Sequence, residues 1–64
     1  MEKDYIELNV FLKINSIAPT GGQAKQLIRS ENIKVNGEIE TRNKRKLHKD
    51  DIVEYENKIY TVEQ

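Results

Sequence analysis

Two glycines stand near the predicted start of a helix in the segment PTGGQAKQLIRS, residues 19–30. Gly21 and Gly22 would occupy the first helical positions, where backbone N–H groups lack an acceptor inside the helix and the helix dipole adds partial positive charge. A bare backbone lets an anion approach these groups, and Lys25 and Arg29 follow on one stripe of the helix. The pattern indicates a seat for one phosphate, while a loose helix start or a close approach to another strand would also account for the glycines.

A second cationic feature is the run Arg42-Asn43-Lys44-Arg45-Lys46, which His48 and Lys49 follow. Cations this close repel one another, so we expect the fold to gain nothing structural from them. Lysines and arginines that neutralise phosphates release counterions, which gives strong, salt-dependent binding. Arginines also fork onto phosphates or stack on exposed bases. The run therefore indicates contact with RNA, although a basic loop that serves stability alone stays open as an interpretation.

The net charge of zero hides a segregation of charge along the chain. Residues 1–24 carry −1, residues 25–49 carry +5 and residues 50–64 carry −4. Such sorting fits a molecule that presents one basic face to a polyanion, and it also fits a plain solvated surface. The alternative function is a small protein-interaction module in which the acidic C-terminal hairpin docks on a basic partner.

Catalysis finds little support in the sequence. His48 is the one histidine and stands beside the basic run, and Ser16 and Ser30 have no evident partner. Asp50-Asp51 suggests a cation site, but carboxylates beside a strand more often bond to a turn. We therefore predict no enzymatic activity, no metal, no cofactor and no small-molecule substrate.

A chain of 64 residues makes one small domain, predicted over residues 1–64, with little stability to spare. It has no cysteine, so disulfides are excluded and a reducing compartment is natural. No apolar run approaches the roughly 20 residues that span a bilayer, and the first residues lack a secretory pattern. We expect a cytoplasmic protein with no membrane partner.

Two short helices are predicted in the first half of the chain. Apolar residues at helical spacing place the first at about Glu7–Asn15, before a break ahead of Pro19. Thr20, with Gln23 three residues on, forms a capping-box pattern. The second helix then runs over about Gly21–Ser30. Its buried side comprises Ala24, Leu27 and Ile28.

Two β-hairpins are predicted in the second half. The first turns at the Asn-Gly pair of residues 36–37, the strongest short hairpin signal. A two-residue loop there would set apolar side chains opposite charged ones, with Ile39 opposite Lys34. Either a bulge shifts the register or Ile39 packs in a different layer, and the sequence leaves both open.

The second hairpin is predicted to turn at Asn57-Lys58. This register pairs two tyrosines and two valines across the strands and puts all four on one face, which we expect to cover the helices. The pairs are Tyr55 with Tyr60 and Val53 with Val62.

The order of these pieces resembles the S4 RNA-binding domain. The matching strings are LNVFLK, TGGQAKQLI, IKVNGEIETRNKRKL and KDDIV, and the resemblance covers residues 6 to about 55. It is closest to the small, stand-alone bacterial members, the YaaA/YbcJ type, in which a glycine pair opens the second helix. It implies an α+β fold with two short helices packed on a small, strongly bent antiparallel sheet.

The resemblance also implies an RNA surface formed by the second helix, its N-terminus and the adjacent basic loop, residues 42–49. Carried over by position, the contacts at the helix are Gly21, Gly22, Gln23, Lys25 and Gln26. Those in the loop are Arg42, Arg45 and Lys46. The charge pattern adds Arg29, Lys44 and Lys49. The family's core positions are matched by Ala24, Leu27, Ile28, Val35 and Leu47.

Three positions depart from the family's pattern. Gly21 stands where many larger members have an arginine, which shifts a phosphate contact to backbone donors and Lys25. Glu31 replaces a glycine, so we expect Asn32 to take the left-handed position. Asp50 replaces a glycine before the last strand pair, in a turn that aspartate tolerates.

The sequence therefore predicts a non-enzymatic protein that binds structured RNA, expected to be ribosomal. It would recognise the shape and backbone of the RNA and act through binding alone. Contact with a ribosomal protein is the further partner that this interpretation allows.

Overall fold

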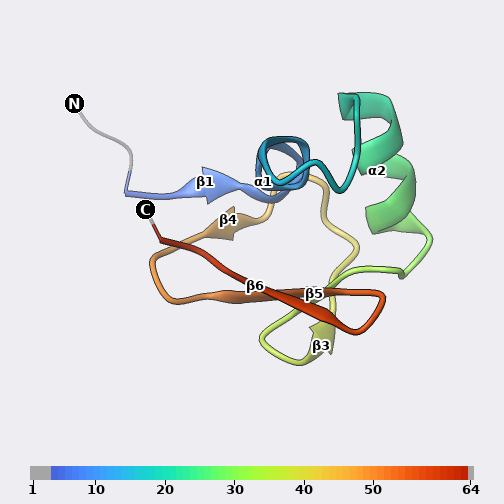
Figure 1. Cartoon of the computed structure of the whole chain (residues 1–64). Helices are drawn as coiled ribbons and strands as arrows, with labels where there is room; N and C mark the ends of the chain where they lie inside the picture. Colours follow the sequence, from blue (N-terminus) through green and yellow to red (C-terminus); the bar gives the residue numbers. More distant parts are fainter. Residues whose placement is uncertain (1–3, 64) are drawn as a thin grey trace.

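Two short helices, α1 (Leu8–Ile14) and α2 (Gly21–Arg29), form one layer of the structure, a computed structural model that describes residues 4–63 (Figure 1). Both agree with the predicted helices to within one residue at each end. α1 begins one residue late because Glu7 pairs with Lys46 in a strand. Neither helix in the described part of the chain is long and apolar enough to cross a membrane.

The ends of α2 are fixed by local hydrogen bonds. At its start the Thr20 hydroxyl accepts from the Gln23 amide at 3.1 Å, which confirms the predicted cap. At its end the amides of Glu31 and Asn32 donate back to carbonyls of the last turn, in the pattern of a Schellman motif. Glu31 takes the left-handed conformation with a φ of 65°, so the expectation that Asn32 would take it is wrong. The motif places its left-handed residue directly after the cap, and α1 ends in the same way at Ser16, with a φ of 61°.

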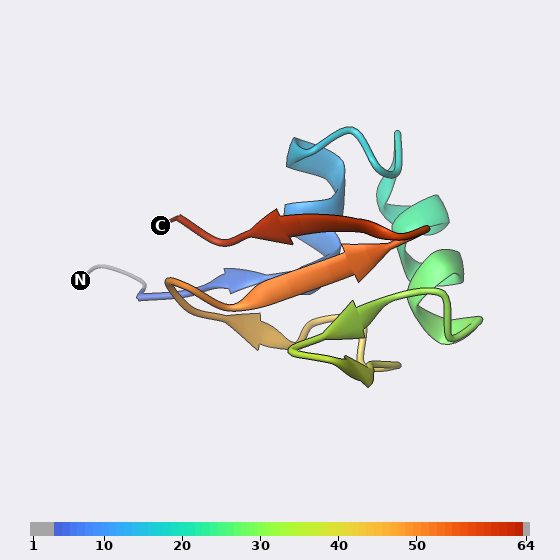
Figure 2. The same ribbon diagram turned by 60° about the horizontal axis from the view of Figure 1, so that its bottom comes forward.

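Short strands make up the rest of the regular structure in residues 4–63, and those labelled β3 to β6 lie below the helices in Figure 1. A two-stranded sheet pairs β1 (Ile6–Glu7) with β4 (Lys46–Leu47), and a four-stranded sheet has the order β3-β2-β5-β6. The strands of the larger sheet are β2 (Lys34–Val35), β3 (Glu38–Ile39), β5 (Ile52–Tyr55) and β6 (Lys58–Thr61). They lie side by side in Figure 2, and each of these pairings is antiparallel. The predicted α+β class is confirmed.

The first hairpin, β2–β3, turns at Asn36 and Gly37 without a bulge. Both turn residues have positive φ, 53° and 88°, as a type I′ turn requires. Ile39 lies opposite Lys34 and keeps 52% of its surface exposed, so it is not packed in another layer. Neither the bulge nor the packing in a different layer is found, because β3 is an edge strand that stays outside the core.

The predicted register of the second hairpin, β5–β6, is wrong by two residues. The turn residues are Glu56 and Asn57, both with positive φ, and Tyr55 therefore lies opposite Lys58. Because side chains alternate with a period of two, this shift leaves each side chain on the face that was predicted. On that face Val53 and Val62 are buried, and Tyr55 and Tyr60 are half-buried against the core.

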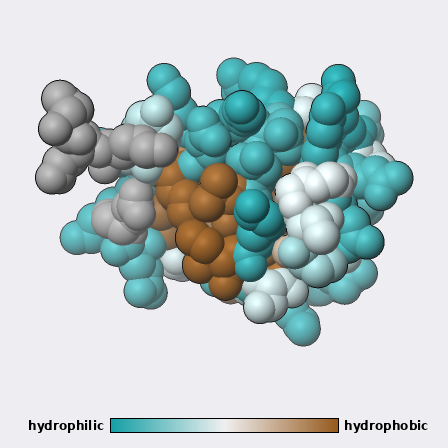
Figure 3. All heavy atoms as spheres, turned by 90° about the horizontal axis from the view of Figure 1, so that it is seen from above, coloured by the Kyte–Doolittle hydropathy of each residue, from teal (hydrophilic) through white to brown (hydrophobic). Residues whose placement is uncertain are grey.

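The core lies between the helices and the strands. Its buried apolar residues are Leu8, Phe11, Leu12, Ala18, Ala24, Ile28, Ile33, Val35, Leu47, Val53 and Val62. Among the predicted core positions, Leu27 is only half-buried. Ile14 exposes 66% of its surface and joins a hollow lined by Ile6, Phe11 and Val62. An apolar patch is visible on this side of the molecule in Figure 3.

Candidate nucleic-acid interface

The start of α2 is sterically open. An added Cβ would meet nothing within 4 Å at Gly21, and at Gly22 it would meet only the Thr20 hydroxyl oxygen at 3.9 Å. Neither glycine has a left-handed φ. A close approach to another strand therefore does not explain the pair, and a loose helix start and a seat for an anion are the explanations that fit.

The remaining candidate residues of α2 fall into two groups. Lys25 and Arg29 are exposed, and neither side chain forms an ion pair within residues 4–63. Gln23 and Gln26 are also exposed, but they line a hollow of about 350 Å³ together with Tyr55 of β5. The two glutamines thus border the β5–β6 hairpin, and the two cations are free to meet a ligand.

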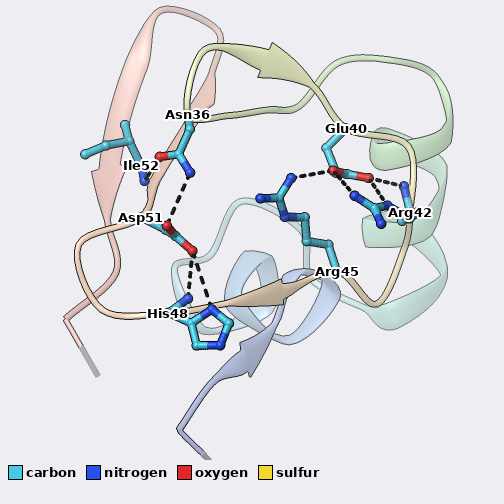
Figure 4. Close-up of polar contacts among 7 residues, drawn as sticks. All are labelled: Asn36, Glu40, Arg42, Arg45, His48, Asp51 and Ile52. Carbon is cyan, nitrogen blue, oxygen red and sulfur yellow. Dashed lines mark hydrogen bonds and ion pairs between the residues drawn. The ribbon is translucent and has the colours of Figure 1, made fainter.

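A buried carboxylate holds two arginines of the basic segment, residues 42–46. Glu40 is only 6% exposed. Its Oε2 accepts from Nε and from the backbone amide of Arg42, each at 2.9 Å. Its Oε1 accepts from Nη1 of Arg45 at 2.7 Å and from Nη2 of Arg42 at 3.3 Å. Figure 4 shows both guanidinium groups turned toward this one carboxylate.

These contacts correct an expectation from the sequence. The fold does gain structurally from the basic segment, because Arg42 and Arg45 neutralise a carboxylate that burial would otherwise destabilise. Hydrogen bonds from Arg42, reinforced by Arg45, outweigh the effect of burial and lower the pKa of Glu40 from 4.5 to about 2. The same contact raises the pKa of Arg42. Glu40 was missed in the sequence because the cations around it suggested a ligand outside the protein.

The backbone of the basic segment caps α1. The side chain of Glu7, at the N-cap position, makes no capping hydrogen bond. Instead the Leu8 amide donates to the Arg45 carbonyl at 2.8 Å, and the Asn9 amide donates to the Asn43 carbonyl at 3.1 Å. The first amides of a helix need acceptors from outside it, and here the segment supplies them. Its conformation is therefore tied to the helix layer.

The structure brings four of the predicted cations together. Arg42, Lys44, Arg45 and Lys46 line an open hollow of about 540 Å³. The ammonium group of Lys46 lies 5.0 Å from the centre of the Tyr5 ring.

Other predicted contacts lie apart from this hollow. The α2 residues do not line it. Lys49 belongs to the connection between β4 and β5, which lies at the opposite end of the molecule from α2 in Figures 1 and 2.

Asp51 serves the turn before β5, as the sequence suggested. Its Oδ2 accepts from the His48 amide at 2.8 Å, and its Oδ1 accepts from Nδ2 of Asn36 at 3.2 Å (Figure 4). The hydrogen bond from the His48 amide is the main reason that the pKa of Asp51 is lowered. Asp50 takes the left-handed conformation, with a φ of 75°. Within residues 4–63 no group of three metal-binding side chains comes together.

Two comparisons with known proteins each match most of the chain. A family model described as the S4 domain matches residues 1–63, a span that includes both helices, both hairpins and the basic segment. The chain is also 36% identical over 56 residues to a Bacillus subtilis (strain 168) protein named probable ribosome maturation protein RlbA. That alignment covers 88% of this chain and 79% of the relative.

Proposed function

The chain belongs to the S4 domain family, and on this premise we propose that it binds structured RNA, ribosomal RNA above all, through the basic segment and the start of α2. It acts by binding, with no catalytic step. The name of the relative, a ribosome maturation protein, supports a ribosomal RNA as the target and the cytoplasm as the compartment.

The observation that carries this proposal is the hollow lined by the four cations of the basic segment. Four positive side chains against one buried carboxylate, Glu40, leave a local charge of +3. The hollow is open to solvent on a backbone anchored to α1, so a phosphate chain can reach it without rearranging the fold. Each phosphate neutralised there would release counterions, and binding would weaken steeply with salt.

The recognition proposed is of shape and backbone. An RNA duplex hides its base edges in a deep, narrow groove and exposes phosphates and 2′-hydroxyls, so a rigid basic surface reads their spacing. The open start of α2 supplies a second contact, in which the Gly21 and Gly22 amides meet one phosphate. Lys25 is exposed on the same helix, one turn on.

The test is RNA binding as a function of salt, measured by fluorescence anisotropy on a labelled stem-loop of ribosomal RNA. The variant is Lys44→Ala with Lys46→Ala, because neither lysine contacts Glu40. The matched control removes two lysines from other surfaces, Lys13 of α1 and Lys58 of β6. We expect the log–log salt slope to flatten by roughly 0.7 to 0.9 for each phosphate that the first variant no longer neutralises, and to stay near wild type in the control. Equal slopes in both variants, or no binding by the wild type, would remove the proposal.

A protein contact is the second candidate function, favoured by the outer face of the larger sheet. Ile39 and Ile59 are 52% and 67% exposed there, and between them lie Lys34 and Glu54, paired across β2 and β5. The hairpin that carries Ile59 is acidic, so its partner would be a basic protein with an apolar patch. Variants of Ile39 and Ile59 that bind RNA normally yet no longer bind a ribosomal protein would support this role.

A further inference from the structure

Glu40 is an unexpected residue in a surface proposed to bind RNA, because its carboxylate is negatively charged. A carboxylate beside phosphate-binding cations repels the ligand, and burying it costs solvation as well. Yet Glu40 is the one buried charged residue in the described part of the chain. Its backbone amide donates to the carbonyl of Ile33, itself fully buried, at 3.0 Å, which fixes the residue to the start of β2. Such a residue calls for a role beyond surface charge.

The geometry around Glu40 resembles a clamp on two guanidinium groups. Arg42 presents Nε and Nη2 to the carboxylate, and Arg45 presents Nη1 from the other side of the turn. A guanidinium carries five N–H donors in a fixed plane, so most donors of both arginines are left for another acceptor. The Arg42 side chain is 75% exposed and that of Arg45 29% exposed, and both line the hollow of the basic segment.

The turn between the two arginines is also held. The Arg45 amide donates to the Arg42 carbonyl at 3.3 Å, and the Arg45 carbonyl accepts from the first amide of α1. Arginine side chains on a mobile loop would lose rotamer freedom on binding, and this loss would weaken the affinity. Here that freedom is already restricted in the folded protein, which is how preorganisation raises affinity.

We propose that Glu40 is a positioning residue that locks Arg42 and Arg45 into one preformed fork for a phosphodiester of the bound RNA. The inference rests on the proposed function and deepens it, because it names the group recognised and the residue that aims the donors. Its consequence is that RNA affinity depends on a negative charge in the binding surface.

Simple electrostatics predicts the opposite effect on RNA affinity when Glu40 is replaced. Replacing Glu40 by glutamine makes the surface more positive by one charge, which by itself would strengthen RNA binding and steepen its salt dependence. Without the clamp, both guanidinium groups are instead freed and binding weakens. Glu38→Gln is the matched control, because Glu38 is exposed two residues away and forms no ion pair within residues 4–63.

The experiment measures the affinity of the wild type, Glu40→Gln and Glu38→Gln for a labelled ribosomal RNA stem-loop over a range of salt concentrations. Each protein is first shown to be folded at the assay temperature by its amide NMR spectrum. We expect Glu40→Gln to bind about fivefold more weakly with a flatter salt slope, and Glu38→Gln to bind up to about twofold more tightly. With a merely structural role for Glu40, the folded Glu40→Gln protein would bind at least as tightly as the wild type, as Glu38→Gln does, and its salt slope would be no flatter.

A second variant covers the case in which Glu40→Gln does not fold. Arg42→Lys keeps the charge of an exposed residue but cannot present two N–H groups to one carboxylate edge. Its control is Lys13→Arg, a charge-conserving exchange at an exposed residue of α1 that lies outside the proposed RNA surface. We expect a severalfold loss of affinity for Arg42→Lys and none for Lys13→Arg. If Arg42→Lys binds as tightly as its control, or if Glu40→Gln binds more tightly than the wild type, the clamp is overturned and the proposed function stands. A wild type that does not bind RNA would overturn the proposed function as well.

Discussion

The start of α2 and the basic segment are the two parts of the proposed RNA surface, and the fold depends on them very differently. At the helix start, a Cβ added at either glycine would meet almost nothing in the protein. In the basic segment, two arginines neutralise the buried Glu40 and two carbonyls cap α1. Binding and stability are therefore separable at the start of α2 and joined in the basic segment.

The same contrast exists within the basic segment, between its arginines and its lysines. Arg42 and Arg45 bond to Glu40, while Lys44 forms no ion pair within residues 4–63 and Lys46 lies over the Tyr5 ring. A variant that removes every cation at once would confuse weaker binding with weaker folding. Substitutions that separate the two kinds of cation are more informative.

The largest effect is expected at Arg45. Replacing it by alanine leaves the carboxylate of Glu40 buried with one partner, so the free energy of unfolding should fall by about 2–3 kcal/mol. Lys44→Ala, one residue away, should change it by less than about 0.5 kcal/mol. Urea unfolding followed by circular dichroism makes the comparison. Equal small decreases in the two variants would mean that the arginines are as dispensable as the lysine.

Acid should remove the contribution of Glu40 in a predictable window. Because the folded-state pKa lies at about 2, below the ordinary 4.5, the stabilisation is complete above about pH 4.5 and is lost as the pH falls toward 2. Glu40→Gln should therefore be less stable than wild type by about 2 kcal/mol at neutral pH, and the difference should shrink over that window. Thermal unfolding between pH 7 and pH 2 measures it. A difference that stays constant with pH would show that the ionised form of Glu40 is not what stabilises the fold.

A smaller gain is expected at the end of α2, away from both regions. Glu31 holds a left-handed conformation that costs a residue with a Cβ about 1 kcal/mol, so Glu31→Gly should stabilise the protein by about that amount. Glu31→Gln removes the charge but keeps the strain, and its stability should stay within about 0.5 kcal/mol of wild type. If the glutamine variant gains as much as the glycine variant, the effect comes from charge and not from the backbone.

The smallest change in stability is expected at Gly22, where a substitution should raise stability and lower RNA affinity. Gly22→Ala adds a Cβ in open space and a better helix former, so the free energy of unfolding should rise by about 0.5 kcal/mol. The same methyl group stands where a phosphate would approach the amides, so RNA affinity should fall a few-fold. Paired melting and anisotropy measurements test both signs. Unchanged affinity would leave the glycines as a loose helix start.

Local signals in the sequence predicted the elements of the fold well. Thr20 and Gln23 place the start of α2, and the Asn-Gly pair at residues 36–37 places the first hairpin. The turn of the second hairpin was placed one residue too late, which shifts the strand pairing by two, because the predicted and the observed turn each contain Asn57 beside a charged residue. Only pairing across the sheet distinguishes these two registers.

The contacts of the site were harder to predict, because they join a buried carboxylate to cations that the sequence analysis assigned to RNA binding. The sequence shows Arg42 and Arg45 as part of one cationic run, and it gives no sign that Glu40 is buried between them. It also gives no sign that the carbonyls of Asn43 and Arg45 cap α1, since that contact joins segments far apart in the chain. The identity of the cations was predictable, but their division into structural and free ones was not.

The most direct test of the proposed RNA surface is to map the RNA contact on the protein by two-dimensional amide NMR. A ribosomal RNA stem-loop is added stepwise to the labelled protein at low salt. We predict that the amides of residues 21–25 and 42–46 shift together, while those of the β5–β6 hairpin stay near their free positions. Shifts confined to the hairpin, or none at all, would contradict an RNA surface on the basic segment and the start of α2.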